Sequence, residues 1–342
     1  MNVSKLISIL SNINAAEATI IANNGKLTIY SESESVKTYA EMSVDIELPK
    51  IMVNVSQLLE ALKRAEGAEL VLTYEDSKLT LKTDNMSFAM NVEEAEHVTI
   101  PVIPSPFYEY FETINFEGLK TAFTKVIDAA SKDKARPHLN TVNVDGYKVV
   151  ATDSFAMSVY DMGQAPETFK DRKFALSCDF VKHILKVGKK ERTANIYLTN
   201  NLFYLRLGDT IFISRVGEPF RMDYERILKE SLQADHNALI TTGDLKKALK
   251  TLKPTLKQVG NYLNITLKEN KTLLKAGDFN LEIVSVYNSE PCQVTLNSKY
   301  VEIFLKTAGN ITNIAIKNEI APVVLTTDDH NYNFVLMPIR AQ

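Results

Sequence analysis

The same order of predicted elements occurs three times along the chain, at a spacing of roughly 120 residues. Each copy has a helix, a turn that leads into a strand, a second helix and two further strands. The turns fall at Asn24-Gly25, Asp145-Gly146 and Glu269-Asn270, and the second helices begin near residues 55, 178 and 297. This spacing is that of a domain rather than of a solenoid repeat. The sequence therefore predicts an α+β protein of three similar domains, each with two helices and antiparallel sheets: 1–104, 105–232 and 233–342.

The helix predicted at 244–253 has an apolar side and a basic side. Leucines recur at helical spacing on one side of this helix, at Leu245, Leu249 and Leu252. Lysines recur with the same spacing on the adjacent side, at Lys246, Lys250, Lys253 and Lys257. Asp244 lies where the first helical amides are unpaired, and Pro254 is expected to limit how far the helix continues. One side is expected to pack on a core and the other to attract anions.

Positive charge is concentrated in the six predicted helices. The formal net charge of the chain is −3. The helical segments carry a net charge of about +11 and the remainder about −14. This separation is typical of a protein that binds a polyanion. The basic residues are mostly lysines, which attract phosphate without reading bases, so sequence-specific DNA binding is disfavoured.

Several other classes of function find no support in the sequence. The two cysteines, Cys178 and Cys292, have neither metal-ligand nor disulfide-framework spacing, and the five histidines share no ligand spacing. Nucleotide-binding glycine motifs and metalloprotease motifs are absent, and Asp153-Ser154 with Asp328-Asp329-His330 are neighbours in sequence rather than a triad. No apolar run is long enough for a signal or membrane segment. We therefore expect a cytoplasmic protein that is not an enzyme and has no cofactor or metal.

Three stretches resemble the bacterial β sliding clamp, the β subunit of DNA polymerase III. The chain has Val150-Ala151-Thr152-Asp153, then FRMDYERIL at 220–228, which is similar to the family's Phe-Pro-Asp-Tyr-x-Arg-Val-Leu, and FVLMPIR at 334–340, which is similar to Tyr-Val-Val-Met-Pro-Met-Arg. The three stretches occur in the family's order and at matching separations. As a set they identify the chain as a divergent relative of these clamps.

The resemblance implies a ring of two head-to-tail copies that encircles double-stranded DNA without sequence preference. Such a ring serves as a processivity factor in DNA replication. The basic helix faces are expected to turn toward the DNA through Lys63, Arg64, Lys125, Lys182, Lys186, Lys246, Lys250, Lys253, Lys299 and Lys306. A basic loop of the family near DNA matches Lys132, Lys134 and Arg136.

The resemblance also implies a pocket for short peptides of the DNA polymerase, the clamp loader and repair proteins. Carried over by position, the pocket residues are Leu139, Thr152, Ser154, Phe155, Ala156, Met157, Arg226, Ile227, Ala321, Val335, Leu336, Met337, Pro338, Ile339 and Arg340. The family has Gly-His-Arg-Leu where this chain has Ser154 to Met157. The peptide preference of the pocket is therefore expected to differ.

Ring closure requires an interface between the first domain of one copy and the third domain of another. Phe88 and Met90 occupy the position of apolar edge-strand contacts in the family, and Leu252 and Leu256 lie near the matching helix end. Pairing of an edge strand across this interface is expected to join two copies. The alternative is a monomeric clamp-like adaptor that binds peptides without forming a ring.

Overall fold

The computed structural model describes residues 2–104, 109–133 and 135–340. The chain divides into two compact units. Unit 1 comprises Met1–Glu117 with Asp179–Val216, and unit 2 comprises Gly118–Cys178 with Gly217–Gln342. The predicted domains 1–104 and 233–342 each fall within one unit, whereas the predicted domain 105–232 contributes elements to both. The three-domain division stays a prediction.

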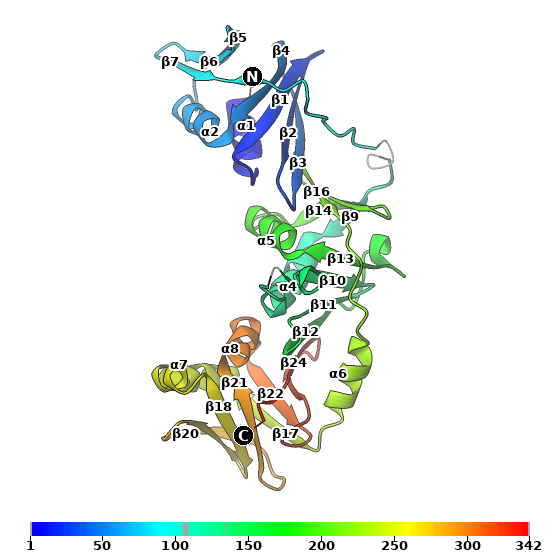
Figure 1. The fold of residues 1–342 in the computed structure, drawn as a ribbon, viewed down its shortest axis with the longest axis vertical. Coiled ribbons are helices and arrows are strands. Elements are labelled where there is room, and N and C mark those ends of the chain that lie inside the picture. Colours follow the sequence, from blue (N-terminus) through cyan, green and yellow to red (C-terminus); the bar gives the residue numbers. More distant parts are fainter. Residues whose placement is uncertain (1, 105–108, 134, 341–342) are drawn as a thin grey trace. The chain divides into compact units, whose positions relative to one another are not determined.

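Unit 1 contains, among its described residues, a nine-stranded sheet and a three-stranded sheet (Figure 1). The nine strands, in spatial order, are β8 (Glu93–Glu94), β4 (Leu48–Asn54), β1 (Glu17–Asn23), β2 (Lys26–Glu32), β3 (Lys37–Ser43), β16 (Thr210–Arg215), β15 (Leu202–Leu207), β14 (Thr193–Leu198) and β9 (Glu112–Asn115). The smaller sheet is β5 (Val71–Glu75), β6 (Lys78–Thr83) and β7 (Met86–Asn91). Antiparallel pairing of β3 with β16 places Ala40 opposite Thr210, so strands from two predicted domains form one sheet.

The helices of unit 1 are amphipathic, and α1 and α2 begin at side-chain caps. They are α1 (Val3–Ser11), α2 (Val55–Arg64) and α5 (Cys178–Val187), whose first residue belongs to unit 2. The Asn54 side chain accepts a hydrogen bond from the Gln57 amide at 3.0 Å, which satisfies one of the unpaired amides of the α2 N-terminus. Leu58 and Leu62 are buried in the core against the strands, which leaves the opposite side of α2 for polar residues.

Unit 2 contains, within the part of the chain that the structure describes, a twelve-stranded sheet. In spatial order its strands are β13 (Lys173–Ser177), β10 (Thr141–Asp145), β11 (Lys148–Thr152), β12 (Ala156–Asp161), β24 (Tyr332–Leu336), β23 (Val323–Thr327), β22 (Ile311–Ile316), β17 (His236–Thr241), β20 (Phe279–Val286), β19 (Lys271–Ala276), β18 (Tyr262–Lys268) and β21 (Cys292–Asn297). Its helices are α4 (Phe116–Val126), which begins in unit 1, α6 (Tyr224–Leu232), α7 (Thr242–Gln258) and α8 (Ser298–Thr307). Short 3-10 helices lie at Ile127–Ala129, Pro137–Leu139 and Glu167–Phe169.

The prediction that Pro254 limits α7 is wrong, because the helix continues through this proline to Gln258. Leu252 and Leu256, on either side of Pro254, are both buried, and α7 contacts β19 and β20. Packing of this apolar side outweighs the one backbone hydrogen bond that proline removes.

The sequence analysis also missed α6. Asp223 caps this helix, since its carboxylate accepts a hydrogen bond from the Arg226 amide at 3.0 Å. Tyr224 and Ile227 pack on one face of the sheet, in a cluster that includes residues of β11, β12, β22, β23 and β24, and α6 contacts β22 and β23. Two features of the sequence could have predicted this helix: the capping residue Asp223 and the helical spacing of Tyr224, Ile227 and Leu228.

Two of the three predicted turns are confirmed in place. Asn24 and Gly25 have positive φ values of 53° and 77°, as a two-residue hairpin turn requires. The third hairpin turns at Glu269-Asn270, between β18 and β19. The second turn was placed one residue early, because Asp145 pairs with Lys148 and the turn consists of Gly146 and Tyr147.

Candidate functional site

Four exposed basic side chains lie on two helices of unit 1. Lys63 and Arg64 are in the last turn of α2, and Lys182 and Lys186 are on α5. Arg64 forms an ion pair with Glu60, and Lys182 Nζ lies 4.0 Å from Asp179. Exposed pairs of this kind contribute at most about 1 kcal/mol, so an anion can compete for these cations.

Unit 2 presents a cavity of about 280 Å³ between α7 and α8 whose rim is basic. Leu249 and Leu305 contribute the apolar part of its lining, and the charged part is Lys246, Lys250, Lys253, Lys306 and Glu302. Lys253 Nζ lies 3.2 Å from Glu302, and Lys306 Nζ lies 2.6 Å from Asp128. Lysines outnumber carboxylates around the cavity, which therefore favours an anion. Lys299 is also exposed on α8.

Lys125 differs from the other predicted DNA-facing residues that the structure describes, because it is half-buried. Its ammonium donates a hydrogen bond to the Thr307 carbonyl oxygen and lies 4.6 Å from the centre of the Tyr332 ring. Burial lowers the pKa of Lys125, and the nearby Asp329 and Asp328 oppose that effect. Its contacts join α4 to α8 and β24, which is the geometry of a structural lysine.

The predicted basic loop is only partly described. Lys132 and Arg136 are exposed, and Arg136 Nε lies 3.6 Å from Asp133. Lys134 lies outside the described residues.

Four of the predicted peptide-pocket residues share one face of the unit 2 sheet. Thr152 lies opposite Met157 on neighbouring strands, and Met157 lies opposite Val335. Residues directly opposite each other on paired strands point to the same face. Helix α6 adds Ile227 to the apolar cluster that contains Met157 and Val335. Thr152, Met157 and Val335 are each at most 5% exposed and Ile227 is half-buried, so these residues form a core beneath α6 whose rim is its accessible part.

The loop Asp153 to Phe155 presents an aromatic ring at the end of this face. Phe155 is 60% exposed, and Ser154 has a positive φ of 82°, which is unusual for a residue other than glycine. The carboxylate of Asp153 accepts hydrogen bonds from the amides of Phe155 and Ala156, both at 2.9 Å. The backbone of Phe155 is thus fixed although its ring is exposed.

Two contacts extend from this loop to distant parts of the sequence. The hydroxyl of Tyr300 on α8 donates a hydrogen bond of 2.6 Å to Asp153. The amide of Met337 donates to the Phe155 carbonyl oxygen at 2.9 Å, and the Met337 side chain is 48% exposed. Sequence reasoning missed Tyr300, since no local pattern links it to a residue 147 positions away.

The remaining predicted pocket residues are either buried on the opposite side of the sheet or exposed to different degrees. Ala156 and Leu336 face each other on the opposite side of the sheet from Met157 and are almost fully buried, so they are core residues. The other members are exposed or half-buried: Leu139, Arg226, Ala321, Pro338, Ile339 and Arg340.

The predicted interface residues divide between core and edge. Leu252 and Leu256 are buried in unit 2, and Met90 is buried in unit 1. Phe88 is half-buried on β7, which lies at the edge of its three-stranded sheet. In unit 2, β20 pairs with β17 only at Val286 and Ser285, so its residues before Ser285 have no strand partner on that side among those described. Val284 is 79% exposed there.

Neither a metal site nor a membrane span is found in the described residues. No three His, Cys, Asp or Glu side chains in that part of the chain gather closely enough to hold a metal ion. None of the helices there combines the length and apolar composition needed to cross a membrane.

Comparison with protein-family models gave no match, and comparison with curated proteins gave none. Solved structures do match, over the whole chain. The DnaN sliding clamp (DNA polymerase III subunit beta) of Bartonella birtlesii bound to griselimycin gives a TM-score of 0.87 at 18% identity, covering 100% of this chain and 99% of that one. The DNA polymerase III subunit beta of Pseudomonas aeruginosa gives 0.87 at 15% identity, with coverage of 99% and 98%. That of Thermotoga maritima gives 0.85 at 19% identity, with coverage of 100% and 98%.

These likenesses show that the chain has the sliding-clamp fold along its full length. The predicted α+β fold class and the resemblance to bacterial β clamps are therefore confirmed as statements about fold.

Proposed function

We propose that this protein is a DNA sliding clamp, a processivity factor that encircles duplex DNA and tethers a polymerase and other partners. The observation that carries the proposal is the coincidence of the clamp fold with exposed lysines on α2, α5, α7 and α8 in an otherwise acidic chain. Lysines attract phosphates without base recognition, so a ring held by topology can slide. The protein acts without catalysis and in the cytoplasm, and its three domains are 1–104, 105–232 and 233–342.

The ring consists of two copies joined through their exposed strand edges. β7, with Phe88, pairs with β20 of the other copy, because both edges lack a partner strand among the described residues of one chain. Since Leu252 and Leu256 are core residues, the interface in unit 2 consists of the β20 edge around Val284 instead.

Partner peptides bind at the end of this face, where Phe155 and Met337 are exposed next to the buried Thr152, Met157 and Val335 and the half-buried Ile227. An apolar side chain that becomes buried here contributes about 1.5–3 kcal/mol before the costs of association, which suits exchangeable partners. Griselimycin, which is bound to the Bartonella clamp, is a probe for this surface.

The decisive experiment measures retention on nicked circular duplex DNA after incubation with a bacterial clamp loader and ATP. We expect the protein to stay on circles through a high-salt wash and to leave once the circle is linearised. Equal binding to circular and linear DNA that moderate salt abolishes would contradict topological binding. That result would favour the monomeric adaptor.

A further inference from the structure

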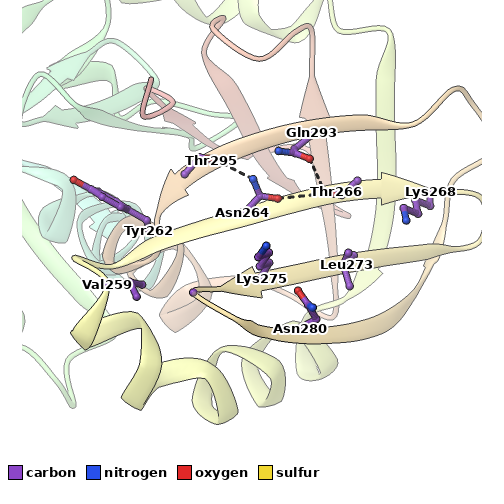
Figure 2. Close-up of a pocket in the computed structure, with 11 residues that line it drawn as sticks. Val259, Tyr262, Asn264, Thr266, Lys268, Leu273, Lys275, Asn280, Gln293 and Thr295 are labelled. Atoms are coloured by element: carbon purple, nitrogen blue, oxygen red, sulfur yellow. Dashed lines mark hydrogen bonds between the residues drawn. The ribbon is translucent and has the colours of Figure 1, made fainter. Parts of the chain in front are cut away.

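A shallow trough lies on the solvent-facing side of four strands of unit 2, β21, β18, β19 and β20 (Figure 2). Its volume is about 710 Å³. The alternate residues of β18, Leu263, Ile265 and Leu267, are fully buried on the other side of the sheet. The trough is therefore a separate surface from the basic cavity between α7 and α8, and none of its lining residues belongs to the peptide face around Met157.

The trough has basic ends and a neutral polar middle. Of the eleven lining residues, Lys268 and Lys275 are charged and none is acidic. Lys271 and Glu282 lie beside the lining on the same face, but they pair with each other at 3.0 Å and add no net charge. Between them lie hydroxyls and amides that can both donate and accept hydrogen bonds. Asn264 Nδ2 donates to Thr295 Oγ1 at 3.2 Å, and Thr266 Oγ1 lies 3.3 Å from Asn264 Oδ1. This network orients the amide of Asn264 toward the trough.

The spacing of these groups is that of an extended peptide. Asn264, Thr266 and Lys268 alternate along β18, so they repeat about every 6.6 Å, the distance between alternate residues of an extended chain. Lys275 on β19 lies directly opposite Asn264 on β18, and Asn264 precedes Lys268 by four residues on that strand. The two lysine backbones are therefore about 13 Å apart along the strand direction, which matches residues i and i+4 of an extended peptide.

We propose that this trough binds an extended acidic segment of a partner protein, with carboxylates four residues apart that pair with Lys268 and Lys275. The neutral row between the lysines contacts peptide groups, which offer both donors and acceptors. A single-stranded nucleic acid fits less well, because its phosphates only accept hydrogen bonds and Tyr262 is the one aromatic ring among the lining residues. The proposal does not depend on ring formation.

The test uses fluorescence anisotropy at low salt with the full chain and three labelled probes. The first is a synthetic peptide with two glutamates separated by three serine or threonine residues. The second carries glutamines in place of the glutamates, and the third is an oligo-dT. The protein variants are the double substitution Lys268→Gln with Lys275→Gln and the control Lys317→Gln, whose lysine is exposed in unit 2 and does not line the trough.

We expect the glutamate peptide to bind the wild type and the control alike, and the double variant to bind it about tenfold more weakly. The glutamine peptide is expected to bind the wild type no more tightly than the glutamate peptide binds the double variant. The proposal is overturned if the glutamate peptide binds the double variant as tightly as it binds the wild type. It is also overturned if oligo-dT binds the wild type more tightly than the peptide does and loses that binding in the double variant. Because all substituted lysines are exposed, unchanged thermal melting is expected to confirm that each variant is folded.

Discussion

Phe155 contributes an exposed aromatic ring to the proposed peptide-binding surface. A large apolar side chain held on a fixed loop loses little entropy when a partner covers it. The chain keeps this ring 60% exposed, and the loop that carries it is fixed by Asp153. This arrangement is typical of a contact residue rather than of a core residue.

Replacing Phe155 with serine is expected to weaken binding of griselimycin about tenfold, since the apolar area of the ring that the ligand would cover is lost. Isothermal titration calorimetry measures the change. Val71→Ser is the matched control, because Val71 is 53% exposed in unit 1 and lies outside the peptide face. Unchanged affinity in Phe155→Ser would remove this residue from the proposed surface.

The hydrogen bond from Tyr300 to Asp153 predicts a pH effect on stability. Burial, and then the bond to Asp153, raise the pKa of Tyr300 above its ordinary value of 10.0. The folded state therefore holds this proton more tightly than the unfolded state, so the stabilisation is complete below about pH 10 and falls as pH rises further. Burial likewise raises the pKa of Tyr332 to about 12, which adds to the loss at alkaline pH.

Tyr300→Phe is expected to lower the free energy of unfolding by about 0.5–1.5 kcal/mol at pH 8, as the bond is lost. The loss of stability between pH 9 and pH 11 should be smaller than in the wild type. Urea unfolding at the three pH values measures both effects. An unchanged alkaline slope would show that Tyr300 ionises alike in the folded and unfolded states.

At the scale of elements, α7 shows how packing overrides a local breaker. Pro254 leaves one carbonyl of the preceding turn without its helical donor, while Leu252 and Leu256 hold the helix on the sheet. The helix is therefore retained at a cost in stability.

Pro254→Ala is expected to raise the free energy of unfolding by up to about 3 kcal/mol, because alanine restores the donor and has the highest helix propensity. Pro254→Gly restores the donor but not the propensity, so it should gain less. Thermal denaturation followed by circular dichroism ranks the three proteins. A loss of stability in Pro254→Ala would mean that the proline ring itself makes a necessary contact.

At the scale of the whole molecule, the proposed clamp has a characteristic salt dependence. Neutralising Lys246 and Lys250 together is expected to reduce the slope of log affinity against log salt by about 0.9 per lysine on duplex DNA. Lys271→Gln is the control, since this lysine is paired with Glu282 away from the helices. Identical slopes in all three proteins would exclude α7 from the DNA-binding surface.

The two-copy ring is tested by Phe88→Asp, which places a charge at the β7 edge. A buried, unpaired carboxylate opposes association, so this variant should sediment as a monomer where the wild type sediments as a dimer. Because Phe88 also packs against the unit 1 core, circular dichroism must show that the variant is folded. A folded variant that remains dimeric contradicts the proposed interface.

The sequence by itself determined the features that depend on local order. The repeated succession of helices and strands, the turn at Asn24-Gly25 and the separation of charge follow from periodicity and residue type, which act over a few positions. The short stretches around Thr152, Phe220 and Phe334 were enough to indicate the fold. The alternation of β12 and β24 did not reveal that Met157 and Val335 face each other, because pairing joins strands about 180 residues apart.

Only the tertiary structure decided which surfaces stay exposed. It placed Lys125 inside a contact between α4, α8 and β24, made Leu252 and Leu256 core residues, and joined β3 to β16 in one sheet. It also brought Tyr300 to Asp153 and assembled the polar trough from four strands. Burial and strand pairing depend on segments that are distant in sequence and meet in space. A local residue pattern identifies the apolar side of a helix or strand, but it does not identify the segment that packs against that side.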